Sequence, residues 1–201
     1  MARRIVPIGK DNLKDLPLPC RNCFFWESTE RISSPLVARG GFEQKTKWFE
    51  DTLNKWGVCG KLLYDNRETL AYVQFAPLPY LPQCNNFPAG PVSEDAIVFS
   101  CLYVIPEMRG RGLGKVLLQS ALKSLFKKRF KTVESFASRL DPHELAVPLD
   151  FYLKNGFYVL RDDHKLPLVR LDLRAAVTWQ VNIQTMLDSI KIPVRVPATS
   201  S

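Results

Sequence analysis

The order of hydrophobic patterns along the chain predicts an α/β (α+β) domain, in which helices flank a mixed β-sheet. A helical pattern comes first, two strands with a short turn follow, and a strand, a helix and further strands come after them. Of the 201 residues, 46% are hydrophobic and 24% are charged, so the chain can bury a sizeable core. This length fits one compact domain with a small extension.

The N-terminal part of the chain is predicted to contain one helix and a hairpin. Residues 1–41 are expected to be an irregular segment, because prolines interrupt its first half. Apolar residues then recur at near-helical spacing from about 42 to 56, and a glycine ends the predicted helix. Two strands over 58–64 and 69–75, with a short polar turn between them, predict a hairpin.

A long proline-rich stretch, residues 76–93, follows the hairpin. Loops of this length inside a compact domain are often functional, so the stretch is expected to form a wall or lid over a substrate cleft. The alternative is a solvent-exposed insertion. Its composition is compatible with both interpretations.

The clearest strand covers residues 96–105, which are apolar on both faces, as in the centre of a sheet. A glycine turn follows it, and a helix over about 112–129 presents one broad apolar face. Residues 131–138 form the next predicted strand. Two strands joined by such a helix should pair in parallel, with a right-handed crossover.

The last part of the chain contains shorter patterns. A helix is predicted over 148–155, and strands over 157–161 and 168–174. Beyond them, apolar residues at helical spacing predict a helix over 175–190. This helix packs on its own domain, which is the default expectation, or on a second subunit in a homodimer.

The turn at residues 106–115 contains Gly110, Gly112 and Gly114, which let the backbone approach a ligand without a Cβ atom in the way. The helix behind the turn directs its unpaired N–H groups and the positive end of its dipole toward the same place. This combination predicts an anion site suited to a phosphate or pyrophosphate.

The charge pattern agrees with an anion site at this turn. Between residues 108 and 133 there are eight basic and no acidic residues, which equals the net charge of +8 for the whole chain. Arg109, Arg111 and Lys115 lie at the turn, where they can meet phosphates. The basic residues at 127–129 lie at the other end of the helix, where they interact favourably with its dipole.

The glycine spacing excludes two common nucleotide motifs. A P-loop requires glycine at position 109 and Ser or Thr at position 116, but the chain has Arg109 and Val116. The dinucleotide-binding pattern read from Gly110 requires glycine at position 115, where Lys115 stands.

The spacing that fits is RxxGxG, formed by Arg109, Gly112 and Gly114. It resembles the acyl-CoA-binding motif of the GNAT superfamily of N-acetyltransferases, in which the turn follows the fourth strand and its backbone amides hold the pyrophosphate of coenzyme A. The resemblance implies acetyl-CoA as co-substrate. It assigns cofactor binding to a run of seven residues: Arg109, Gly110, Arg111, Gly112, Leu113, Gly114 and Lys115.

A second likeness to the same family lies downstream, where Tyr152, Gly156 and Phe157 match a helix that ends in tyrosine, three residues and Gly-Phe. In many members this tyrosine is taken as the general acid for the departing CoA sulfur, which makes Tyr152 the candidate catalytic residue. The alternative is a tyrosine that only packs on the short helix. The likeness covers about 42–174.

The family resemblance also implies the architecture and the remaining binding residues. It implies a mixed, mainly antiparallel seven-strand sheet, a domain over residues 1–174 and an extra C-terminal helix and tail over 175–201. Family members polarise the thioester carbonyl with a backbone N–H that a bulge and a splay of the fourth strand leave free. That position corresponds to Leu102, Tyr103 and Val104.

The general base for the acceptor amine is not identified by the sequence. Some histone-modifying members carry a glutamate at the position held here by Val98, and the strand over 96–105 contains no carboxylate or histidine. A water relay is one possibility. The candidate side chains lie before and after this strand: Glu94, Asp95, Asp141, His143 and Glu144.

These observations predict an N-acetyltransferase that moves an acetyl group from acetyl-CoA to a primary amine by direct attack in a ternary complex. The acceptor is a small molecule or a peptide amine, expected to be bound by residues 20–45 and 76–93. The alternative is a catalytically silent acyl-CoA sensor of the same fold. A nucleic-acid partner is not expected, because the basic residues cluster at the turn and no nucleic-acid-binding motif is present.

The five cysteines are expected to be free thiols, because their number is odd and no export signal is visible. Cys20 and Cys23 have CxxC spacing, but a second such pair is missing, so no metal is expected. No apolar run approaches the roughly 20 residues of a membrane-spanning helix. A cytoplasmic protein without a membrane partner is therefore predicted.

Overall fold

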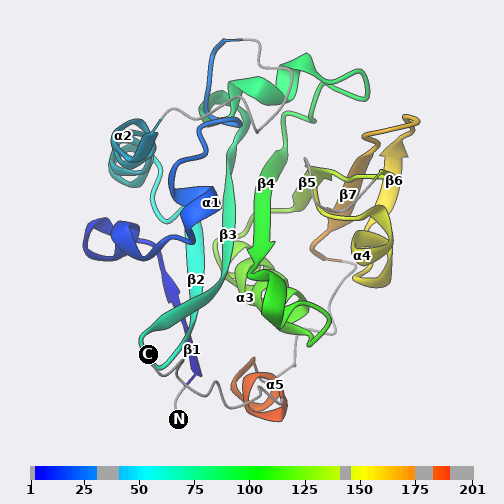
Figure 1. Cartoon of the computed structure of the whole chain (residues 1–201). Helices are drawn as coiled ribbons and strands as arrows, with labels where there is room; N and C mark the ends of the chain where they lie inside the picture. Colours follow the sequence, from blue (N-terminus) through cyan, green and yellow to red (C-terminus); the bar gives the residue numbers. More distant parts are fainter. Residues whose placement is uncertain (1–2, 31–40, 141–145, 175–182, 191–201) are drawn as a thin grey trace.

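The computed structural model describes residues 3–30, 41–140, 146–174 and 183–190, and these residues form a seven-stranded sheet of order β1-β2-β3-β4-β5-β7-β6 (Figure 1). Neighbouring strands are antiparallel, except that β4 and β5 are parallel. The predicted mixed, mainly antiparallel sheet is therefore confirmed. The strands are β1 (Arg3–Pro7), β2 (Gly60–Asp65), β3 (Glu68–Pro77), β4 (Ala96–Val104), β5 (Thr132–Phe136), β6 (Tyr158–Arg161) and β7 (Leu168–Asp172).

Helices cover both faces of the sheet. They are α1 (Leu18–Arg21), α2 (Gly41–Lys55), α3 (Leu113–Lys127), α4 (Leu149–Lys154) and α5 (Ile183–Ser189). Alternation along β3 separates the two faces, because Tyr72 belongs to a core cluster with α2 and its neighbours Ala71 and Val73 belong to a cluster with α3. Side chains of α4 and α5 join the cluster of α3.

The helix α3 buries the apolar face that its sequence pattern predicted. Its buried residues are Leu113, Val116, Leu117, Leu118, Ser120, Ala121, Leu122 and Leu125. They form one broad stripe that packs on β2, β3 and β4. The helix therefore positions the glycine turn against the end of β4.

The prediction of an irregular N-terminal segment is wrong for the described part of it. Residues 3–7 form β1, which pairs with β2, and a short 3-10 helix, η1 (Lys10–Asp15), and α1 follow. The prolines do not prevent this, because Pro7 is the last residue of an edge strand and Pro17 is the N-cap of α1. Residues 31–40 lie outside the described residues.

The proline-rich stretch, residues 76–93, is not a solvent-exposed insertion. It continues β3 to Pro77 and then forms two 3-10 turns, η2 (Leu78–Tyr80) and η3 (Pro82–Asn86). Its apolar side chains are buried in a core cluster that also contains Trp26 and Phe136. The stretch therefore packs against the Trp26 and Phe136 side chains.

The described part of the C-terminal helix packs on its own domain. The helix α5 contacts α3 and β1 (Figure 1). Arg3 donates hydrogen bonds from Nη1 to the carbonyl oxygen of Leu187 at 2.5 Å and to that of Ile190. The buried side chain of Leu187 belongs to the same core cluster as α3. Residues 175–182 of the predicted helix lie outside the described residues.

A buried lysine connects β2 to α3. The Nζ atom of Lys61 donates hydrogen bonds to the Ser120 carbonyl oxygen at 2.8 Å, to Ser120 Oγ at 2.9 Å and to Ser124 Oγ at 2.6 Å. All three acceptors are neutral. Burial therefore lowers the pKa of Lys61 to about 8, and the positive charge of Lys127 acts in the same direction.

This lowered pKa predicts that stability rises with pH. Between about pH 8 and 10.5 the unfolded chain holds a proton on Lys61 that the folded chain has lost, so the free energy of unfolding rises by up to about 3 kcal/mol. Denaturant unfolding of the wild type and Lys61→Met at pH 7.5 and 10.5 measures the difference. Lys55→Met, on an exposed position of α2, is the matched control and should keep the wild-type pH dependence.

Candidate functional site

The central strands β4 and β5 separate part of the way along the sheet. They pair only over three positions, from Ala96 with Thr132 to Val98 with Glu134, although β4 continues to Val104. On the other side of β4, Ser100 is an extra residue without a partner in β3, since Gln74 pairs with Cys101 and Phe75 pairs with Phe99. The bulge and the separation leave the backbone of the last part of β4 without a strand partner on its β5 side.

Two hydroxyl groups lie where the strands separate. Ser135 Oγ donates a hydrogen bond to the Phe99 carbonyl oxygen at 2.7 Å, and it lies 2.8 Å from the Tyr152 hydroxyl. Because the proton of Ser135 is used toward Phe99, Tyr152 is the donor to Ser135. Burial raises the pKa of Tyr152, so this side chain is neutral at physiological pH and carries a proton.

The glycine turn forms the N-terminus of α3. Gly110 and Gly112 have φ angles of +73° and +85°, which are favourable only for glycine. Gly112 is the N-cap, and among the described residues no side chain caps the helix. The first intrahelical bond runs from the Val116 N–H to the Gly112 carbonyl oxygen at 3.1 Å, so the preceding N–H groups are available to a ligand.

The arginine of the motif joins this turn to the end of β4. Arg109 Nε donates to the Val104 carbonyl oxygen at 3.1 Å, and the guanidinium lies 5.7 Å from the centre of the Tyr103 ring. Both contacts connect the turn to the strand segment that the separation from β5 leaves open.

A single cavity of about 1160 Å³ connects these features. Of the predicted binding residues, nine line it together with Tyr152: Leu102, Tyr103, Val104, Arg109, Gly110, Gly112, Leu113, Gly114 and Lys115. Arg111 does not line it. Arg111 instead borders a smaller pocket of about 350 Å³ between the start of α3 and α5.

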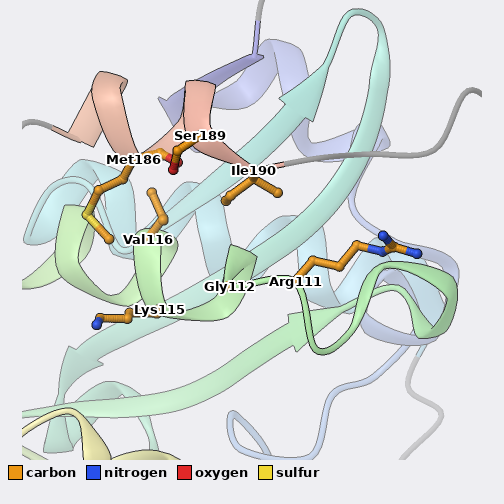
Figure 2. A pocket seen from close by; sticks show the side chains of 7 residues that line it. All are labelled: Arg111, Gly112, Lys115, Val116, Met186, Ser189 and Ile190. Carbon is orange, nitrogen blue, oxygen red and sulfur yellow. The ribbon is translucent and has the colours of Figure 1, made fainter.

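Figure 2 shows the smaller pocket from close by. The side chains of Val116, Met186 and Ile190 lie between α3 and α5, and the guanidinium of Arg111 extends away from α5. The interior of this pocket is therefore mainly apolar, and its charged groups lie at its edges.

The opposite end of the large cavity is formed by α1, the segment after it, α2 and the outer face of β3 and β4. The residues that line this end include Leu18, Pro19, Cys20, Asn22, Cys23, Trp26, Lys45, Tyr72, Cys101 and Phe136. The stretch 76–93 does not contribute a described lining residue. It contacts the cavity only indirectly, by supporting Trp26 and Phe136.

A buried ion pair forms part of this end of the cavity, because Lys45 lines it. Lys45 Nζ forms an ion pair with Glu27 and donates to Gln74 Oε1 at 2.8 Å. Gln74 Nε2 donates to Glu27 Oε1 at 2.5 Å, and the Tyr72 hydroxyl donates to Gln74 Oε1. The Lys45 and Glu27 side chains are 4% and 0% exposed, so each charge depends on the other for its stabilisation.

Cys20, Cys23 and Lys45, which line the cavity, belong to the range 20–45 that the sequence assigned to acceptor binding without singling them out. Cys101 also lines the cavity and was not indicated. Strand alternation could have found Cys101, which shares the outward face of β4 with Tyr103. The ion pair joins two segments far apart in sequence and has no local signature.

The acidic candidates for a general base are not gathered here. Asp95 lies at the start of β4 and forms an ion pair with Arg170 at 3.0 Å, and the hydrogen bond from Arg170 lowers its pKa. Neither Asp95 nor the exposed Glu94 lines the cavity. Asp141, His143 and Glu144 lie outside the described residues.

No metal centre is found among the described residues, since no three His, Cys, Asp or Glu side chains converge there as ligands. The five cysteines are free thiols. In the same described residues, no helix is both long and apolar enough to cross a bilayer.

Comparison with known proteins agrees with this geometry. Residues 62–159 match the family model of the acetyltransferase (GNAT) domain. A search of the curated proteins finds no match.

Among solved structures, the chain is similar to the PaiA N-acetyltransferase from Thermoplasma acidophilum in complex with coenzyme A, with 17% identity and a TM-score of 0.59, over 86% of this chain and 99% of that one. It is similar to YncA, a putative acetyltransferase from Salmonella typhimurium with acetyl-CoA, with 13% identity and a TM-score of 0.59. The match covers 86% of this chain and 95% of that one. It is also similar to the ribosomal-protein-alanine N-acetyltransferase from Brucella melitensis, with 14% identity and a TM-score of 0.58. The match covers 84% of this chain and 99% of that one.

The buried ion pair predicts a specific response to mutation. Lys45→Met leaves the Glu27 carboxylate buried without a cation, so we expect the free energy of unfolding to fall by about 3–5 kcal/mol. The double variant Glu27→Gln/Lys45→Met removes both charges and should recover most of this loss. Urea unfolding at pH 7 measures both, and equal stability of the single and double variants would contradict the prediction.

Proposed function

We propose that the protein transfers an acetyl group from acetyl-CoA to a primary amine by direct attack in a ternary complex, because residues 62–159 match the acetyltransferase (GNAT) domain model and the seven-stranded sheet fits the GNAT fold. The observation that carries the proposal is the continuous cavity. It runs from the glycine turn, past the opening between β4 and β5, to the space between α1, α2 and the outer face of β4. A donor at one end and an acceptor at the other would meet at the opening.

The glycine turn has the features that a diphosphate requires. The uncapped N–H groups at the start of α3 and the positive end of the helix dipole favour an anion. Arg109 and Lys115 add positive charge from the cavity wall. These residues would hold the diphosphate of coenzyme A, whose thioester supplies the acetyl group.

The open side of β4 suits the thioester carbonyl. Negative charge develops on this oxygen during attack, and a fixed N–H donor stabilises it. The strand segment Leu102 to Val104 lacks a β5 partner, so its backbone can provide such a donor. Because the donor is backbone, the identities of these three side chains matter less than the separation of the strands.

We assign the general-acid role to Tyr152. Its hydroxyl lies at the point where the strands separate and holds a proton through physiological pH, and the CoA sulfur must gain a proton as it leaves. Ser135 fixes the position of this hydroxyl. The packing role of the tyrosine ring is compatible with the catalytic one, because Tyr152 is buried in the core and also borders the cavity.

The acceptor is proposed to be a small-molecule or peptide amine that enters at the end formed by α1 and α2. We place the reaction in the cytoplasm, as five free thiols favour a reducing compartment. The second candidate is a sensor that binds acyl-CoA without turnover. One observation favours it, namely that no described residue of the cavity wall is Asp, Glu or His.

Replacing the helix N-cap tests the diphosphate site. In Gly112→Asp, a carboxylate stands where the diphosphate is proposed to bind, so we expect acetyl-CoA affinity to fall by 100-fold or more, about 3 kcal/mol. Gly112→Asn is the matched control, since asparagine has the same shape, is neutral and tolerates a positive φ. Isothermal titration of both variants isolates the charge. Equal affinities of the two variants would refute a diphosphate at this helix terminus.

Replacing the proposed acid tests turnover. Tyr152→Phe removes the hydroxyl and keeps the buried ring, so we expect kcat to fall about 10²-fold with the acetyl-CoA affinity unchanged. CoA release is measured by chromatography over a panel of amino acids, polyamines, aminoglycosides and peptides. Full turnover of the variant would exclude the acid role. Tight acetyl-CoA binding by the wild type without any amine-dependent release would favour the sensor.

A further inference from the structure

Three thiols and one ammonium group lie together at the acceptor end of the cavity. Cys20 belongs to α1, Cys23 follows it, Lys45 belongs to α2 and Cys101 belongs to β4, and all four line the same wall. The proposed transferase chemistry gives them no role. The cluster nevertheless lies on the side from which an amine must approach the acetyl group.

The described cavity wall contains few groups able to accept a proton from an amine. It lacks carboxylates and imidazoles, so thiols and tyrosines are the groups that can form an anion. Burial raises the pKa of Tyr72 and of Tyr152, and that of Tyr103 is also raised. The tyrosines are therefore poor bases near neutral pH.

The three thiols differ in their surroundings. The hydrogen bond between the Cys20 and Cys101 thiols raises the pKa of Cys20 and lowers that of Cys101. Burial raises the pKa of Cys23. Among the three thiols, Cys101 is the one whose pKa is lowered, and a thiolate is therefore favoured at this position.

The charged groups that face Cys101 also favour a thiolate there. The Lys45 ammonium lowers the pKa of Cys101, whereas burial and Glu27, which is paired with Lys45, oppose this effect. The other titratable neighbours, Cys23, Tyr72 and Tyr152, are uncharged. Lys45 is thus the cation in reach of the thiolate, and its position is fixed by Glu27 and Gln74.

The strand bulge presents this thiol to the cavity. Ser100 is the unpaired extra residue, and Cys101, next to it, directly precedes the open backbone segment that begins at Leu102. Ser100 also lines the cavity, and its buried Oγ has no hydrogen-bond partner among the described residues.

We propose that Cys101 is a catalytic residue, the general base that takes the proton from the acceptor amine, with Cys20 and Lys45 as its positioning residues. This inference rests on the proposed acetyltransferase function. The Cys101 thiolate removes one proton from the ammonium group R–NH₃⁺, and the freed electron pair of nitrogen forms the C–N bond with the acetyl carbonyl carbon.

The remaining steps balance without another reactant. The C–S bond breaks and its electron pair stays on the CoA sulfur. The second proton of the attacking nitrogen reaches that sulfur through Tyr152, which gives CoA–SH and the N-acetyl product. Cys101 then releases its proton to solvent and is a thiolate again.

The thiolate is tested first, because this test needs no acceptor. Iodoacetamide alkylation of each cysteine is followed by peptide mass spectrometry between pH 6 and 10, in the wild type, Cys20→Ala and Cys23→Ala. We expect Cys101 to react at lower pH than an ordinary cysteine, Cys20→Ala to shift its profile to higher pH, and Cys23→Ala to leave it unchanged. A Cys101 profile that Cys20→Ala does not move overturns the proposal.

The catalytic role is tested with the amine that gives the most CoA release. Cys101→Ala and Cys101→Ser should each lower kcat about 10²-fold while acetyl-CoA affinity, measured by titration, stays at the wild-type value. In Cys20→Ala, the acid limb of the plot of kcat/KM against pH should move to higher pH, which a purely structural role of Cys101 would not produce. Wild-type kcat/KM in Cys101→Ala overturns the proposal, as does an acid limb that disappears in His143→Gln or Glu144→Gln.

Three further outcomes separate this proposal from others. A mass increase from an acetyl group on Cys101 after incubation with acetyl-CoA alone would replace the base role by a covalent one. Failure of the wild type to bind acetyl-CoA would refute the proposed function itself. Retained binding and turnover in all Cys101 variants would refute only the base.

Discussion

The separation of β4 from β5 is the constraint on which the rest of the site depends. A continuous sheet would fill the hydrogen-bonding edge of β4 and close the route through the middle of the molecule. The separation is built into the fold in two ways. An extra residue, Ser100, bends β4, and Ser135 reaches across from β5 to the Phe99 carbonyl at the last point of contact. Where the backbone hydrogen bonds between β4 and β5 end, the Ser135 hydroxyl therefore supplies the hydrogen bond that the Phe99 carbonyl oxygen needs.

The glycine turn is coupled to this opening through the chain itself. The strand that separates is also the strand that runs into the turn, and Arg109 connects the two by its hydrogen bond to Val104. The apolar stripe of α3 fixes the helix on the sheet, so the positions of its N–H groups relative to the open strand follow from core packing. One strand–turn–helix unit therefore positions both the proposed diphosphate site and the open segment of β4.

The sequence predicted this unit well, because each part of it has a local signature. An apolar strand, three glycines and an amphipathic helix can be found within about thirty residues without knowledge of the fold. The N-terminal segment could not be predicted in this way. Its strand is short and lies at the edge, and its prolines, usually signs of irregular structure, occupy the few positions that helices and edge strands accept. The sequence assigned residues 20–45 to acceptor binding, but it could not show that Cys20, Lys45 and Cys101 line one cavity, because they come from three elements that only the tertiary structure brings together.

The buried pair of Lys45 and Glu27 shows how stability and function are connected at that end. Burying two charges is costly, and an apolar pair of similar size is often as stable, so stability alone does not explain the pair. Its position gives a better reason. The pair holds an ammonium group at a fixed place beside Cys101, and Gln74 and Tyr72 complete the network from the neighbouring strand. A lysine that was free to move would be hydrated and would stabilise a thiolate weakly, whereas a desolvated lysine held by Glu27 and Gln74 acts in a lower dielectric. The N-terminal segment that carries Cys20 and Glu27 therefore contributes both to the wall of the cavity and to the ion pair that fixes Lys45 there.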